Sequence, residues 1–206
     1  MRTLVIDSAT EACSVALFDG EQLVAGDFRM LGRGHAEHLV PMIADLPEQG
    51  RAERIAVALG PGSFTGVRVG LAAARALALA WNAELTGYPT LDLVAAMACA
   101  RAGDVPVAVA MTGGHGEWFV QGFSAEAVST RPLASLKPSA AVATAPESLI
   151  AGSQAEAFVA ERGSGEAMQI WPDARAFQQL AKAALTSKVQ PLYGRAPDAK
   201  LPQDSR

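Results

Sequence analysis

Short apolar runs separated by polar turns open the chain. Residues 4–6 and 13–18 are such runs, and both are typical of buried strands. Asp19 and Gly20 follow the second run, and this dipeptide favours a hairpin turn because both residues tolerate positive φ. A third strand is then expected over residues 22–28. The pattern predicts an antiparallel meander at the start of the fold.

Helical spacing follows the meander. Apolar side chains recur at Leu39, Met42, Ile43 and Leu46, which share one face of a helix, and Gly50 marks the end of the segment. The pattern therefore predicts a first helix before residue 50.

A strand, a glycine turn and a long helix come next. Residues 55–59 form a short apolar run, residues 60–63 a turn, and residues 64–81 a helical stretch. Three strands, a helix, a strand and a helix are the half-unit of the actin-like ATPase fold (ASKHA, ribonuclease H-like). In that fold, two lobes face each other across a nucleotide cleft. We therefore predict an α/β fold with two lobes.

The second half of the chain is less regular. We place the boundary after a further helix over residues 91–100, which gives an N-terminal lobe, 1–103, and a smaller, degenerate lobe, 104–206. The elements expected in the second lobe are strands over 105–111 and 118–123, a short helix around Phe158, an amphipathic helix over 177–185 capped by Asp173, and an extended tail over 191–206. Residues 135–150 show weak periodicity and receive no assignment.

Composition narrows the class of protein. Among 206 residues, 50% are hydrophobic and 18% charged, which excludes a largely disordered chain. The net charge of -4 lacks the basic footprint of a protein that binds nucleic acid by itself. Cys13 and Cys99 form no disulfide framework, which is typical of a reducing compartment.

No targeting or membrane segment is expected. The apolar run before Asp7 is too short for a signal peptide. The most apolar stretch, residues 67–81, is interrupted by Arg68 and Arg75 and is shorter than the roughly 20 residues that span a bilayer. We therefore expect a cytoplasmic protein without membrane contact.

The turn after the first strand is a candidate phosphate loop. Asp7, Ser8 and Thr10 occupy the position at which actin-like ATPases bind phosphate and a metal-bound water. The alternative is a polar turn whose side chains bond their own backbone. The corresponding loop of the second lobe, residues 112–116, has no aspartate, which disfavours autonomous ATP hydrolysis. We expect no cofactor of its own, with ATP or ADP bound only within a complex.

The most specific segment is residues 60–68, Gly-Pro-Gly-Ser-Phe-Thr-Gly-Val-Arg. A glycine turn that leads into a helix is able to cradle an anion. The segment is neither a Walker loop nor a nucleophile elbow. The alternative is that Ser63 or Thr65 caps the helix and the glycines permit close packing.

Small residues recur every four positions along the helix that follows: Gly66, Gly70, Ala74 and Ala78. Such a stripe allows another element to approach closely, and the sequence leaves open whether that element is the protein's own core or a partner. Arg68 and Arg75 share another edge of this helix and are suited to pairing with a partner's carboxylates.

His35 and His38 are a weak candidate for a metal site. Residues three apart share a helix face, but zinc needs at least three ligands, and Glu37 points away from the other two. His35 lies on the apolar face, where a packed neutral histidine is the commoner outcome. We expect no metal.

The motifs at residues 7–10, 34–43 and 60–71 resemble those of the TsaB (YeaZ) family within the glycoprotease-like (Kae1/TsaD-related) superfamily. The likeness is close over about residues 1–100. Over the second lobe it is limited to Gly-Glu before Trp118 and to Pro-Leu-Tyr with Arg195. The family usually has an aspartate and basic residues where this chain has residues 112–115.

The resemblance implies a non-catalytic scaffold subunit with an actin-like fold. Such a subunit pairs with the catalytic subunit TsaD and works with TsaE to threonylcarbamoylate the tRNA adenosine beside the anticodon. It contacts tRNA only indirectly, and a homodimer through the same helices is the other form. The catalytic relative binds metal through histidines four apart, whereas here they are three apart, so that ligand geometry is not carried over.

The resemblance also implies an interface on the helices of the first lobe. The positions expected there are His38, Met42, Gly66, Arg68, Gly70, Ala74, Arg75 and Ala78. We expect Gly70→Leu or Ala74→Trp to abolish pairing without unfolding the chain. The competing hypothesis is a metal- or ATP-dependent hydrolase or transferase that uses Asp7, Thr10, His35 and His38.

Overall fold

The predicted meander is present. The computed structural model describes residues 1–103 and 105–194. Its first strands are β1 (Arg2–Asp7), β2 (Ala12–Asp19) and β3 (Gln22–Met30), paired antiparallel. Gly20 turns the hairpin between β2 and β3 with φ 58°. The dipeptide that favoured a turn in the sequence therefore makes one.

The first sheet is completed by parallel strands. β4 (Arg54–Ala58) pairs with β1, and β5 (Glu84–Tyr88) pairs with β4, which gives the order β3-β2-β1-β4-β5. The sequence pattern did not predict β5. It is short and Gly87 interrupts its apolar pattern, so only pairing with β4 defines it.

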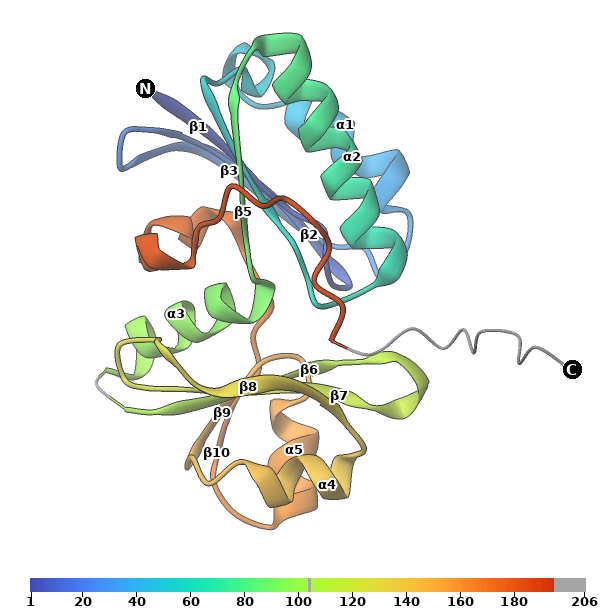
Figure 1. Ribbon diagram of the computed structural model, residues 1–206, viewed down its shortest axis with the longest axis vertical. Coiled ribbons are helices and arrows are strands. Elements are labelled where there is room, and N and C mark those ends of the chain that lie inside the picture. The colour runs from blue at the N-terminus through green and yellow to red at the C-terminus, as the bar shows by residue number, and fades with distance from the viewer. Residues whose placement is uncertain (104, 195–206) are drawn as a thin grey trace, which may run out of the picture.

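Helices cover both faces of this sheet (Figure 1). On one face lie α1 (His35–Ala44) and α2 (Phe64–Trp81), the second with the predicted bounds. On the other face lies the 3-10 helix η3 (Ala174–Gln179), and α3 (Thr90–Ala102) lies between η3 and the second sheet. The helix α3 is buried along most of its length because it packs against η3 on one side and against the second sheet on the other.

The second sheet repeats the topology of the first. Its strands are β6 (Val107–Thr112), β7 (Trp118–Phe123), β8 (Ser129–Leu136), β9 (Leu149–Ala151) and β10 (Glu166–Met168), and their order is β10-β9-β6-β7-β8. The helices α4 (Pro138–Thr144) and α5 (Ala155–Arg162) hold the places of α1 and α2. The unassigned residues therefore contain the end of β8, α4 and most of β9. The division between lobes stays a prediction, and Asp104 lies outside the described residues.

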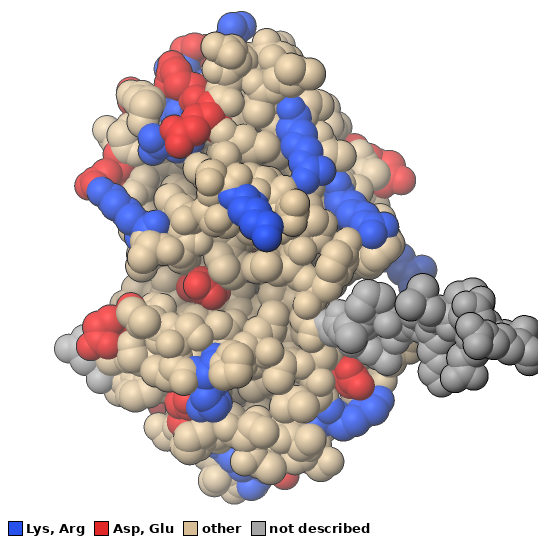
Figure 2. Space-filling view, in the orientation of Figure 1, with Lys and Arg blue, Asp and Glu red and all other residues tan. Residues whose placement is uncertain are grey.

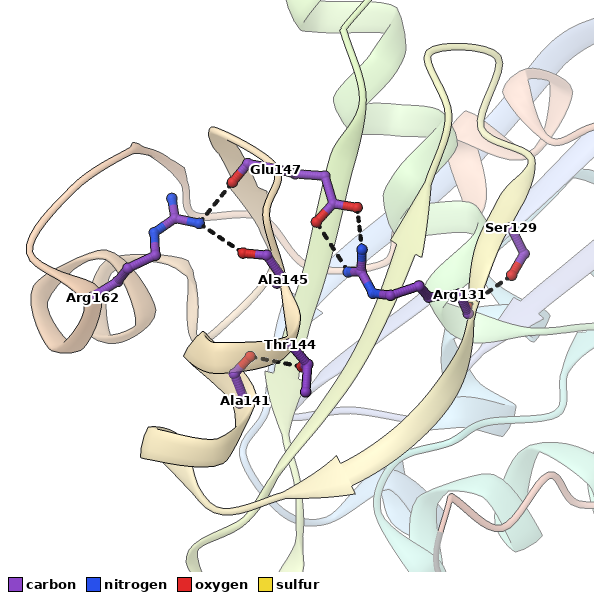
Figure 3. A network of polar contacts seen from close by, with 7 residues as sticks. All are labelled: Ser129, Arg131, Ala141, Thr144, Ala145, Glu147 and Arg162. Carbon is purple, nitrogen blue, oxygen red and sulfur yellow. Dashed lines mark hydrogen bonds and ion pairs between the residues drawn. The ribbon is translucent and has the colours of Figure 1, made fainter.

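A network of charged side chains connects elements of the second lobe (Figure 3). Glu147, before β9, receives two hydrogen bonds from the guanidinium of Arg131 on β8, at 2.5 and 3.0 Å. Arg162 at the end of α5 donates to the carbonyl oxygens of Ala145 and Glu147. These hydrogen bonds join β8, the segment before β9 and the end of α5.

The amphipathic helix predicted over residues 177–185 is wrong. The segment forms two 3-10 turns, η3 (Ala174–Gln179) and η4 (Lys182–Ala184), with Leu180 extended between them. Asp173 does cap the first turn, accepting a hydrogen bond from the Arg175 amide at 2.9 Å. The ring of Phe177 packs against Phe18 and Tyr88, so docking on the first sheet overrides the helical pattern.

The chain then returns along α2 as an extended segment, residues 186–194, which we call the C-terminal strap (Figure 1). It is bonded to the end of the sheet by paired amides and carbonyls of Thr186 and Gly87, at 2.8 and 2.9 Å, and by the Leu192 amide to Leu59. The predicted extended tail agrees with residues 191–194. Arg195 and the rest of that tail lie outside the described residues.

The helix α2 is, by length and composition alone, apolar enough to cross a membrane. It carries Arg68 and Arg75, and Gly66, Gly70 and Ala74 pack it against the first sheet. Its apolar character is therefore that of a helix with one buried side.

Candidate functional site

A cleft of about 380 Å³ lies between the two lobes. The first lobe contributes residues 9–11 and 61–64, and the second contributes residues 111–115 and Phe119. The candidate phosphate loop, the glycine turn and the divergent loop of the second lobe therefore meet at one place, as the actin-like prediction requires. Thr10 lines this cleft, whereas Asp7 and Ser8 do not.

Asp7 is buried below the cleft at the carboxyl end of β1. Its carboxylate accepts hydrogen bonds from the Ala9 amide at 3.0 Å and from the Tyr88 hydroxyl at 3.3 Å. Burial outweighs these bonds and raises the pKa of Asp7 to about 7. The carboxylate is thus turned into the protein rather than toward a ligand in the cleft.

The other side chains of this turn are also bonded within the chain. Ser8 donates to the Gly66 carbonyl at 2.9 Å, and the Thr10 hydroxyl accepts from the Ala12 amide at 3.2 Å. This geometry is the polar turn that the sequence left open as the alternative to a phosphate loop. Phosphate binding by Asp7, Ser8 and Thr10 stays a prediction.

The glycine turn before α2 is packed against the phosphate-loop position. The Ser63 amide donates to the Ala9 carbonyl at 2.6 Å, and the Ser63 hydroxyl accepts from the Gly66 amide at 3.2 Å. A Cβ at Gly62 would overlap the Ala9 carbonyl. Ser63 therefore caps the helix, and glycine at position 62 permits the close approach.

The stripe of small residues faces the protein's own core. A Cβ at Gly66 would overlap the Ser8 carbonyl, and one at Gly70 would lie 2.5 Å from Ser8 Oγ. Ala74 is fully buried and Ala78 is half-buried. Three of the four small residues proposed for the interface thus pack inside the subunit.

This packing corrects the expectation for two substitutions. A leucine at Gly70 or a tryptophan at Ala74 would collide with the first sheet, so either change would disturb the fold. Neither substitution separates partner binding from folding.

Of the two interface residues proposed on α1, one is buried and one is exposed. Met42 is buried in the core, whereas His38 is exposed. His35 is buried, and its Nε2 lies 3.4 Å from the Ala12 carbonyl oxygen. Within residues 1–103 and 105–194, no three His, Cys, Asp or Glu side chains are placed to hold a metal ion.

The outer face of α2 holds the exposed candidates. The Arg68 guanidinium lies 3.5 Å from the centre of the Phe64 ring and donates to the Tyr193 hydroxyl at 3.1 Å. Arg75 donates to the Val189 carbonyl of the strap at 2.7 Å. Blue side chains lie over α2 and the strap in Figure 2.

Sequence reasoning missed three groups on this face. Phe64 is 60% exposed, Leu79 is 87% exposed and Tyr193 is 57% exposed. Leu79 lies on the side of α2 away from the small-residue stripe. The helical spacing of the sequence was therefore enough to predict that its side chain is exposed. The position of Tyr193 had no such signal, because residues distant in sequence bring it to α2.

Comparison with known proteins assigns the family. A model of the family described as "TsaD: tRNA N6-adenosine threonylcarbamoyltransferase" matches residues 29–140, which are more than half of the chain. The chain belongs to this family.

Relatives in the TsaD family carry a more specific description. The Escherichia coli (strain K12) protein described as tRNA threonylcarbamoyladenosine biosynthesis protein TsaB is 39% identical over 122 residues, 57% of this chain and 52% of that protein. The Haemophilus influenzae protein of the same description is 40% identical over 98 residues, 45% of this chain and 40% of that protein. The chain spans about half the length of the curated relatives it matches.

Solved structures extend the likeness over both lobes. A Pseudomonas aeruginosa protein described as similar to the peptidase YeaZ aligns with a TM-score of 0.78 and 28% identity, over 94% of this chain and 99% of that chain. YeaZ from Pseudomonas aeruginosa has the same fold, with a TM-score of 0.77 and 24% identity over 93% of this chain and 99% of that chain. The predicted α/β actin-like fold and the resemblance to the TsaB (YeaZ) group of the TsaD family are confirmed.

Proposed function

We propose that this protein is a non-catalytic subunit in the synthesis of threonylcarbamoyladenosine on tRNA. It binds the catalytic subunit TsaD through the outer face of α1 and α2, and works with TsaE while TsaD modifies the adenosine beside the anticodon. It acts in the cytoplasm and contacts tRNA only through the complex. A homodimer through the same face is its form without the partner.

One observation carries this proposal. The exposed side of α1 and α2 presents large apolar side chains, among them Val40 at 59% and Leu79 at 87% exposed. Exposed apolar groups on adjacent helices are typical of a surface that a partner covers. The resemblance to the TsaB family, in which helices of the first lobe are expected to form the subunit contact, supports this choice of face.

The cleft supports a scaffold better than an enzyme. The Asp7 carboxylate is occupied by the Ala9 amide and the Tyr88 hydroxyl, and His35 is held near the Ala12 carbonyl. The competing hydrolase or transferase would need Asp7, Thr10, His35 and His38 to face one reacting group. His38 is exposed on α1, while Asp7 is buried under the cleft.

The test is complex formation with TsaD from the same organism. We expect size-exclusion chromatography with light scattering to show a heterodimer for the wild type, and Leu79→Glu to weaken it by about tenfold or more. Because the side chain of Leu79 is exposed, this change leaves thermal unfolding of the free chain unaltered.

A matched control is available in the second lobe. Val128 is also a large exposed aliphatic residue, at 59%, and Val128→Glu introduces the same charge far from α2. We expect Val128→Glu to bind TsaD normally. Absence of a wild-type complex in the presence of TsaE, ATP and tRNA refutes the scaffold role. If the isolated chain hydrolyses ATP and Asp7→Asn abolishes this activity, the competing hydrolase or transferase hypothesis is favoured.

A further inference from the structure

The C-terminal strap lies beside the exposed face of α2, with Val189 partly buried against the core. Among its residues 186–194, none has a buried side chain. It is nonetheless held at both ends by backbone hydrogen bonds, from Thr186 to Gly87 and from Leu192 to Leu59. The strap therefore has a fixed backbone, and its side chains form part of the surface beside α2.

The strap holds the two arginines of α2. The Tyr193 hydroxyl receives a hydrogen bond from Arg68, and the Val189 carbonyl receives one from Arg75. Phe64 stacks on Arg68 and lies 6.4 Å, centre to centre, from the Tyr193 ring. Both guanidiniums are therefore fixed by neutral groups before any partner arrives, which lowers the entropy lost on binding.

Within residues 1–103 and 105–194, no carboxylate forms an ion pair with the cations of this face. Residues 64–81 and 186–194 contain Arg68, Arg75 and Lys188 but no Asp or Glu, in a chain whose net charge is -4. Among the ion pairs of the described residues, Arg54, Arg131 and Arg175 contact carboxylates, whereas Arg68 and Arg75 do not. Fixed cations without carboxylates are complementary to an acidic surface.

We propose that the strap is half of the docking face, and that it holds Arg68 and Arg75 in position for an acidic segment of the partner protein. This inference rests on the docking function proposed above and adds the chemistry of the partner and the role of residues 186–194. The exposed ring of Phe64 and the exposed side chain of Leu79 supply the apolar part of the same face.

A protein fits this face better than a nucleic acid. Nucleic-acid affinity comes largely from many contacts between cations and phosphates, whereas this face offers three cations interleaved with apolar side chains. Aromatic residues and arginine are enriched at the centres of protein interfaces.

Charge reversal tests the chemistry of the partner. We expect Arg68→Glu with Arg75→Glu to weaken TsaD binding at least about tenfold in 50 mM salt, because like charges then face each other. Arg51→Glu with Arg101→Glu is the matched control, since both arginines are exposed and lack carboxylate partners among the described residues. Wild-type affinity should fall as salt rises, whereas the affinity of the reversed variant should rise, because salt screens the repulsion between like charges.

The strap is tested through Tyr193. Tyr193→Phe keeps the ring and removes the hydroxyl that holds Arg68, so we expect it to weaken TsaD binding about threefold to tenfold and to do nothing in an Arg68→Ala background. Thermal unfolding of the free chain reports any purely structural effect of either change.

The outcomes separate the two proposals. No complex with the wild type overturns both. A normal complex that charge reversal leaves unchanged, or that the control variant weakens equally, overturns the acidic partner while the scaffold role stands. Equal effects of Tyr193→Phe with and without Arg68 overturn the role of the strap. Loss of tRNA binding, with TsaD binding intact, in the charge-reversed variant would assign the face to nucleic acid instead.

Discussion

The hydroxyl of Tyr88 lies 3.3 Å from a carboxylate oxygen of Asp7, and both side chains are almost fully buried. Asp7 ends β1 and Tyr88 ends β5, so the contact joins the carboxyl ends of two parallel strands across β4. This edge is where open α/β sheets commonly bind ligands. Here the acidic group of that edge is bonded to the protein itself.

The buried Asp7 makes stability depend on pH. Burial raises its pKa from the ordinary value of 3.8 to about 7, so the folded chain binds a proton more tightly than the unfolded chain. Folding stability therefore decreases as pH rises from about 4 to about 7 and then levels, by roughly 4 kcal/mol at most. Asp7→Asn should remove this loss, and the variant should gain stability over the wild type at pH 8 but not at pH 4.

Chemical denaturation at a series of pH values measures this effect. Tyr88→Phe serves as the companion variant, because it removes a hydrogen bond that favours the ionised carboxylate and should raise the pKa of Asp7 further. A difference between wild type and Asp7→Asn that is constant with pH would contradict the assignment.

Gly70 and Ser8 should be coupled. A Cβ at Gly70 meets only Ser8 Oγ too closely, at 2.5 Å, while its next neighbours lie at 3.6 and 3.8 Å. Gly70→Ala should destabilise the wild type by about 1–3 kcal/mol. In a Ser8→Ala background the obstacle is absent, and the higher helix propensity of alanine should make the same change stabilising by up to about 1 kcal/mol.

Gly66 provides the control for that cycle. A Cβ there overlaps the backbone carbonyl of Ser8, which no side-chain change removes. Gly66→Ala should therefore destabilise equally with and without Ser8→Ala. Urea unfolding of the three single and two double variants measures these effects, and additive effects at Gly70 and Ser8 would show that the two groups do not touch.

The Arg131–Glu147 pair should matter more than the ion pairs at the surface. The side chain of Glu147 is 7% exposed and that of Arg131 is 28% exposed. Glu147→Ala leaves the guanidinium without its partner and should cost about 2–3 kcal/mol, between the values for exposed and fully buried pairs. Asp27→Ala breaks a pair with side chains 33% and 42% exposed and should cost less than about 1 kcal/mol.

Ser14 should anchor the returning C-terminal part of the chain. Its hydroxyl accepts from the Ala174 amide at 2.9 Å and lies 3.5 Å from the Pro172 carbonyl oxygen. Ser14→Ala leaves that buried amide without its acceptor and should cost about 1–3 kcal/mol. Hydrogen exchange at the Ala174 amide should speed up in this variant and not in Ser129→Ala, whose hydroxyl is exposed. Unchanged exchange in Ser14→Ala would exclude an anchoring role.

Local sequence patterns determined most of the first lobe. The spacing of apolar residues and the turn dipeptide Asp19-Gly20 are short-range signals, and the meander, α1, β4, α2 and α3 follow from them. Ser63 before the helix likewise specifies its own cap. The motif at residues 60–68 carried the resemblance, and its Gly62 and Gly66 are required by close contacts with Ala9 and Ser8 in this chain.

Tertiary structure decided the rest. The strands β9 and β10 are too short to show a period, and Gly87 interrupts the apolar pattern of β5. All three exist because a neighbouring strand supplies their hydrogen-bond partners. The helical pattern at Phe177 gave way to 3-10 turns because aromatic packing on Tyr88 is stronger than local propensity.

The same distinction holds for the candidate site. A four-residue spacing identifies a stripe of small residues but not the element it faces, and only the fold shows that Gly66 and Gly70 meet Ser8. The partnership of Arg68 with Tyr193 joins residues 125 positions apart, so no local signal contains it. Sequence thus determined which side chains are present on α2, and long-range packing decided which of them remain on the surface.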